Sequence, residues 1–193
     1  MRQPLWNSPL WPWSIFLTVA SAIVMMIYGS WLEKITPHAI VALELAGSAT
    51  RTQQLFTAWG ADGQRLAGFL LGFDFLFIAA YSTSIALACL WAQDGFNEQG
   101  WPLAGLGGFL AIAVPIGGLF DSIENISLLN QLLYGVSDGW ALAARILALS
   151  KFVLVIAGMV FFALGALANR RPIVGLIVGL IAVMIARPVI ACL

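Results

Sequence analysis

The sequence contains few charged residues. Only 9% of the 193 residues are charged, whereas 61% are hydrophobic, and the mean hydropathy is +0.95. Soluble domains carry about 25% charged residues, so this chain has too few to cover a water-facing surface. We therefore expect an integral membrane protein in contact with the lipid bilayer. An all-α bundle of four to five transmembrane helices is the fold that satisfies its backbone there.

The charges that are present cancel, and metal-binding side chains are scarce. The formal net charge is zero, which leaves no broad basic face to attract nucleic acid. Cys89 and Cys192 lie in apolar stretches without metal-ligand spacing. They are predicted to be small, buried hydrophobic residues. His38 is the single histidine, so bis-histidine haem ligation within this chain is excluded. A partner such as Glu44 stands six residues away, which is not a helical spacing, so no metal site is predicted.

Enzyme motifs are absent as well. The sequence has no HExxH, no GxSxG, no phosphate-cradling Walker loop and no CxxC. The absence of these motifs favours a protein that is not an enzyme, and the sequence identifies no cofactor.

Hydrophobic runs divide the chain into five predicted spans within a single membrane domain, residues 1–193. A group of tryptophans before the first run is typical of an interfacial aromatic belt. A cleaved signal peptide is the rival interpretation of that run, but it continues well past the small residues at 20–22, which favours a retained span. The predicted spans are 14–32, 64–92, 102–133, 140–168 and 172–192.

The longest polar interval separates the first two spans. We expect a short helix over 38–46 after Pro37, and a second helix over 49–59 that Ser48 caps and Gly60 ends. In the second helix apolar and polar residues fall on different sides. The interval is therefore predicted to include an amphipathic segment at the membrane interface.

Charged residues outside the spans give a weak indication of orientation. The turn at 169–172 contains Arg170 and Arg171, and placing it in the cytoplasm puts the N-terminus inside. Lys34 and Arg51 would then lie outside, which counts against this orientation. The expected location is the inner membrane of a bacterium.

The third span contains an unusually polar stretch, residues 118–131. Asp121, Glu124 and Asn125 are three and four residues apart and therefore share one helix face. A charge near the bilayer centre costs about 3 kcal/mol, so such residues usually face a protein interior or a wet cavity. Pro115 followed by Gly117–Gly118 predicts a kink or a thin patch with exposed backbone directly before Asp121, or else only a bend that improves packing.

Other spans place ionisable side chains at a similar depth. Asp74 and Tyr81 are two helical turns apart in the second span, and Lys151 lies about 11 residues into the fourth. Three acids and one lysine leave two carboxylates unpaired. Protons, Arg145, hydrogen bonds from neighbouring polar groups or a bound cation would each compensate them. The predicted ligand- or ion-binding residues are Asp74, Tyr81, Asp121, Glu124, Asn125 and Lys151.

Two GxxxG patterns, Gly68 with Gly72 and Gly175 with Gly179, indicate faces that another helix can approach closely. They are candidate contacts with other membrane protein subunits.

Three functions fit these features. The first is the binding or translocation of a proton, a cation or a small amphipathic ligand at the acidic site. The second is an accessory or structural subunit of a larger membrane complex. The third is a membrane enzyme that modifies a lipid. A structural polar network that only fixes helix register is the simplest alternative for the acidic residues themselves.

Several of these residues also form a recognisable pattern. Phe73-Asp74 with Tyr81, then Phe120-Asp-Ser-Ile-Glu-Asn125 and a lysine in the next span, with Leu-Glu-Leu-Ala-Gly at 43–47, resembles uncharacterised small bacterial multi-pass membrane proteins. The similarity covers roughly residues 14–168. It implies no activity; it implies that the six predicted site residues act as a set.

Overall fold

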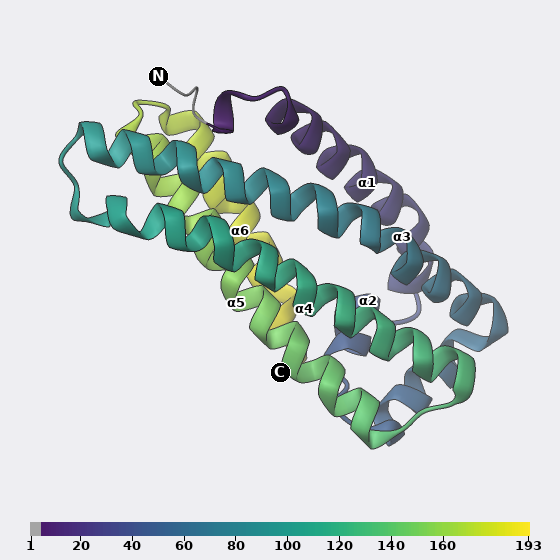
Figure 1. Cartoon of the computed structure of the whole chain (residues 1–193). Helices are drawn as coiled ribbons and strands as arrows, with labels where there is room; N and C mark the ends of the chain where they lie inside the picture. Colours follow the sequence, from purple (N-terminus) through teal and green to yellow (C-terminus); the bar gives the residue numbers. More distant parts are fainter. Residues whose placement is uncertain (1–4) are drawn as a thin grey trace.

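The computed structural model describes residues 5–193, and this part of the chain is helical without strands (Figure 1). Two short 3-10 helices, one short α-helix and five long α-helices follow one another. In chain order they are η1 (Leu5–Asn7), α1 (Leu10–Glu33), α2 (Ala39–Glu44), α3 (Ala49–Glu98), η2 (Pro102–Gly105), α4 (Leu106–Tyr134), α5 (Asp138–Ala168) and α6 (Pro172–Cys192).

The five long helices are each long and apolar enough to cross a membrane, which confirms the all-α bundle. Every predicted span lies within one of them or, for the third, within η2 and α4 together. The membrane-compatible fold follows directly from the apolar runs, because a helix satisfies its backbone internally.

Three of these helices form the centre of the bundle. α3, α4 and α5 contact one another, α1 packs on α3, and α6 packs on α5. Gly117 and Gly118 allow the close approach: a Cβ on Gly118 would lie 3.2 Å from the Cβ of Ser82, and one on Gly117 would lie 3.3 Å from the Cβ of Leu154. α4 continues as one helix across Pro115, so the glycine pair serves packing against both neighbours.

The chain changes direction within α3 at Gly60, whose φ of 63° and ψ of −173° interrupt the helix. The segment 49–59 before this break is the predicted amphipathic helix. Its Phe56 and Trp59 are buried against α1 and α2, and the Trp59 indole donates a hydrogen bond to Thr36 at 3.0 Å. Its apolar side therefore covers one end of the bundle.

The predicted short helix after Pro37 is α2, and it lies inside the bundle. It contacts all five long helices, and Ala39, Ala42, Leu43 and Glu44 on it are buried. Glu33 at the end of α1 anchors its start, since its carboxylate accepts hydrogen bonds from the backbone of His38 at 2.8 Å and Ala39 at 3.0 Å. Residues 39–44 are thus a re-entrant segment that carries a carboxylate into the protein interior.

The two ends of the bundle are held differently. At the end where α1 stops and α5 starts, which we call the first-loop end, the Asp138 carboxylate accepts a hydrogen bond of 2.7 Å from the Ala49 backbone. At the opposite end the Trp6 indole donates to the Asp94 carboxylate at 2.7 Å. Figure 1 shows the re-entrant α2 near the first-loop end, close to where α4 and α5 are joined.

The GxxxG glycines do not behave alike. A Cβ on Gly175 would lie 2.8 Å from the Ala163 carbonyl oxygen, so this glycine lets α6 approach α5. Nothing lies within 4 Å of such a Cβ on Gly68, Gly72 or Gly179. Within the described chain, the second-span pair therefore mediates no close helix contact.

Gly47 connects the re-entrant segment to α3 under two constraints, and we expect Gly47→Ala to destabilise the protein. Its φ is +69°, and an added Cβ would lie 2.8 Å from Cδ of Arg145. The left-handed backbone alone costs about 1–2 kcal/mol for a non-glycine residue, and the clash adds to it. Thermal unfolding in detergent measures the loss. Gly100→Ala is the matched control, because Gly100 has φ +68° with nothing within 4 Å; equal losses would show that Arg145 does not constrain this turn.

Candidate functional site

Lys151 is the centre of a buried ionic group. Its Nζ lies 2.6 Å from Asp121 Oδ1, 2.9 Å from Glu124 Oε2 and 3.2 Å from Glu44 Oε1. The exposed fraction is 5% for Lys151 and Asp121, 7% for Glu44 and 0% for Glu124. One ammonium group thus faces three carboxylates that are all buried.

Helix periodicity explains how α4 and α5 present these groups. Asp121 and Glu124 are three residues apart and lie on the same side of α4. On α5, Ala141, Ala144 and Ala148 precede Lys151 at helical spacing and are all at least 98% buried. These small side chains let α5 approach closely, so the long lysine side chain reaches the carboxylates.

Asp121 is the best-satisfied carboxylate of the group. Its Oδ1 accepts a hydrogen bond from Lys151, and its Oδ2 accepts one of 2.8 Å from the Tyr81 hydroxyl of α3. Because both oxygens of Asp121 have donors, Asp121 and Lys151 form the best-ordered ion pair of the site.

Asp74 joins the group through Asn125. The Asn125 amide donates to Asp74 Oδ2 at 2.8 Å and to the Leu71 carbonyl at 3.4 Å. Asp74 is three to four residues from the buried Leu70, Leu71 and Ile78, so it lies on the inward face of α3, yet it is only half-buried. Neighbouring side chains therefore leave part of this inward carboxylate uncovered.

Glu44 is the member of the group that sequence reasoning missed. Sequence reasoning placed Glu44 in a short helix between the first two spans and gave it no role in the site, whereas the structure carries it inward on α2. Burial raises the pKa of its carboxyl above the ordinary value of 4.5, while Lys151 acts in the opposite direction and Asp121 adds to the increase. The available signal was the apolar surrounding: Ala39–Ala46 contains no other polar side chain.

We call the complete set the acid–lysine cluster. Its residues come from four separate elements, and six of them are the predicted site residues, which the structure brings together. The cluster comprises Glu44 from α2, Asp74 and Tyr81 from α3, Asp121, Glu124 and Asn125 from α4, and Lys151 from α5.

Arg145 does not compensate the acids as one alternative suggested. Within residues 5–193, the ion pairs are those of Lys151 and an exposed pair between Arg65 and Asp62 at 3.1 Å. The Arg145 side chain instead packs over Gly47. The cluster therefore holds four carboxyl groups and one internal cation.

Several polar atoms of the cluster have no hydrogen-bond partner. Oε2 of Glu44, both oxygens of Glu124 and Oδ1 of Asn125 are buried and unpartnered, apart from the ion pair of Glu124 with Lys151. Buried polar atoms are normally satisfied by protein or ordered water. Protons or water molecules are the species that would satisfy these four atoms.

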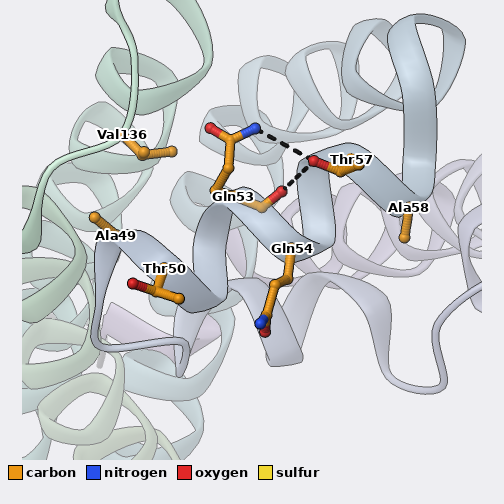
Figure 2. A pocket seen from close by; sticks show the side chains of 7 residues that line it. All are labelled: Ala49, Thr50, Gln53, Gln54, Thr57, Ala58 and Val136. Carbon is orange, nitrogen blue, oxygen red and sulfur yellow. Dashed lines mark hydrogen bonds between the residues drawn. The ribbon is translucent and has the colours of Figure 1, made fainter.

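Two surface hollows lie at the ends of the bundle and are not lined by cluster residues. One, of about 700 Å³, lies over segment 49–59 and is open and shallow; Figure 2 shows Gln53 and Thr57 hydrogen-bonded on its surface. The other, of about 290 Å³, is lined by Trp6, Trp91 and Asp94 among others. Among residues 5–193, no group of three acidic, histidine or cysteine side chains is arranged to hold a metal ion.

The fold and site together define a helical bundle of five potential membrane spans around a buried lysine held by three acids. Comparisons with protein-family models, curated proteins and solved structures find no match. The function is therefore argued from the geometry of the cluster.

We expect Tyr81→Phe to destabilise the protein, because it removes the hydroxyl that donates to Asp121 and leaves a buried carboxylate oxygen unsatisfied. A hydrogen bond to a charged group contributes about 1.5–3 kcal/mol. Thermal unfolding in detergent measures the loss, and Tyr134→Phe is the control because Tyr134 is 83% exposed. An equal effect of both changes would contradict a specific role of the Tyr81 hydroxyl.

The raised pKa of Glu44 makes stability depend on pH. A raised pKa in the folded state means that the folded protein binds this proton more tightly than the unfolded chain. The stability of the wild type relative to Glu44→Gln should therefore be greatest below pH 4.5 and fall as the pH rises. Unfolding midpoints of both proteins between pH 4 and 9 provide the measurement. A relative stability that rises with pH would show that the Lys151 ion pair outweighs burial.

Proposed function

We propose that the acid–lysine cluster binds and releases protons within the membrane, and that this protein is a small proton-translocating membrane protein. The observation that carries the proposal is the excess of carboxyl groups around Lys151. The ion pairs of Lys151 with Asp121, Glu124 and Glu44 place this excess on a single cation.

Charge balance supports partial protonation. With every group ionised, four carboxylates and one ammonium would leave three uncompensated negative charges in an apolar bundle. Each buried charge costs several kcal/mol unless it is paired and hydrogen-bonded. Like charges that share a site also favour protonation of one another. The cluster is therefore most stable when it holds protons.

The surroundings of the cluster do not supply another countercharge. α2 contributes Glu44, α3 contributes Asp74 and Tyr81, α4 contributes Asp121 and Glu124, and α5 contributes Lys151. Within residues 5–193, α1 and α6 form no ion pair with it. The protonation state of the cluster is thus set by its own members.

A proton fits this site better than the other ligands considered. The three carboxylates converge on Lys151 Nζ, so a metal cation would have to replace an ammonium group that is covalently part of the chain. An amphipathic ligand needs room, and the pronounced hollows lie away from the cluster. A proton needs only an unpartnered oxygen.

The partners of each carboxylate suggest which groups exchange protons. Asp121 has donors on both oxygens, whereas Glu44 and Glu124 have free oxygens. Asp74 is half-buried and has one oxygen bonded to Asn125. Glu44 and Glu124 are therefore the proposed proton carriers, and Asp74 is a candidate for the exchange with the surroundings.

Proton release on a pH jump tests this function. When the pH is raised from 6 to 9, the wild type in lipid nanodiscs should release more protons than the Glu44→Gln, Glu124→Gln double variant, because burial raises the pKa of Glu44 above its ordinary value. Infrared absorption of protonated carboxyl groups, measured across the same range, identifies the groups involved.

Glu98→Gln is the matched control, because Glu98 is exposed and exposed glutamates are already ionised above pH 6. In proteoliposomes the wild type should also dissipate a proton gradient faster than the Glu44→Gln, Glu124→Gln double variant. If the wild type exchanges no proton in this range, or if the folded double variant dissipates the gradient equally well, the cluster is a structural network and the proposal is wrong.

A further inference from the structure

Unpartnered buried polar atoms occur within the cluster and at one position between it and the first-loop end. They belong to Glu44, Glu124, Asn125 and Gln131. Gln131 is 1% exposed, and neither its amide nitrogen nor its amide oxygen has a hydrogen-bond partner. A buried amide without partners costs about 1–3 kcal/mol, so water molecules are expected to satisfy it.

Gln131 is aligned with the cluster along α4. It lies seven residues after Glu124, which is two helical turns along the same face and about 10 Å. Ser127 is buried between them. On α5, the buried alanines 141, 144 and 148 lead from the first-loop end to Lys151, so one wall of this region consists of small side chains.

The opposite half of the bundle has fewer unpartnered polar groups. Serines do not distinguish the halves, because Ser127 donates to the Ile123 carbonyl of its own helix at 2.9 Å and Ser14 donates to the Trp11 carbonyl at 2.8 Å. The difference lies in the amides: among the described residues, both polar atoms of Gln131 are buried without a partner, whereas Gln93 has one such atom, Oε1, near the other end.

A surface hollow lies at the same end of the bundle as Gln131. It is the hollow of about 700 Å³ over segment 49–59, and Val136, five residues after Gln131, forms part of its wall. Figure 2 shows uncharged polar side chains, including Thr50, Gln53 and Gln54, on this surface. Such side chains bind water without adding a charge barrier.

We propose that a chain of water molecules runs from this hollow past Gln131 to Glu124 and Glu44, so that the cluster exchanges protons with the first-loop side of the membrane. The role of this route in proton exchange rests on the proposed proton-binding function. Gln131 is then a positioning residue, which holds water in the route without binding the transferred proton itself.

Thiol accessibility tests the route independently of proton binding. Gln131→Cys is made in a background in which Cys89 and Cys192 are changed to Ser, and it is reconstituted in liposomes. A small membrane-impermeant methanethiosulfonate should label it from the first-loop side only. Lys34→Cys and Gln99→Cys, both exposed at opposite ends of the bundle, mark the two sides, and Gln93→Cys is the matched control on the other half. No labelling of Gln131→Cys, or labelling from the other side, would overturn the route.

Gln131→Leu tests whether the route carries protons. We expect it to slow proton release at least tenfold without changing the number of protons released, whereas Gln93→Leu should leave the rate unchanged. If Gln131→Leu does not fold, Gln131→Asn keeps an amide and should retain most of the rate, while Ser127→Cys provides a second labelling position. Absence of proton release in the wild type would refute the proposed function, whereas normal release rates in folded Gln131→Leu would refute only the route.

Discussion

The burial of Lys151 among carboxylates is the interaction on which the rest of this structure depends. An ammonium group cannot remain charged in an apolar bundle without acids close by, and the acids cannot remain there without the lysine. Each of the three ion-pair partners is held by different means: Asp121 by Tyr81, Glu124 by the packing of α4 and α5, and Glu44 by the re-entrant α2. The cluster thereby ties four elements together at one level.

The same interaction explains features that are distant from it. Gly117 and Gly118 bring α3 and α5 close to α4, which is the condition for side chains from three helices to meet. The Glu33 carboxylate caps the start of α2, and Gly47 turns the chain back towards α3 while Arg145 packs over it. The backbone on both sides of α2 is therefore held in a precise geometry, which places Glu44 beside the buried Lys151.

Stability and the proposed proton exchange make opposite demands on this site. A fully satisfied network would be rigid, and its protons would leave slowly. Here Asp121 is fully bonded, whereas Glu44 and Glu124 retain unpartnered oxygens and Gln131 extends the unsatisfied groups towards one end. One carboxylate thus anchors the lysine while the others remain available, which is the arrangement expected of a site that works by gaining and losing protons.

The sequence by itself determined the membrane-compatible helices, the break at Gly60 and most of the cluster, because hydrophobic run length and helical periodicity act locally. Asp121, Glu124 and Asn125 share a face by spacing alone, and charge burial made Asp74 and Lys151 their expected neighbours. Only the tertiary structure decided the place of Glu44, and it showed that Gly68 and Gly72 make no close helix contact within the described residues. The physical reason is that α2 is too short to show periodicity, and its position follows from contacts with all five long helices, which no local pattern encodes.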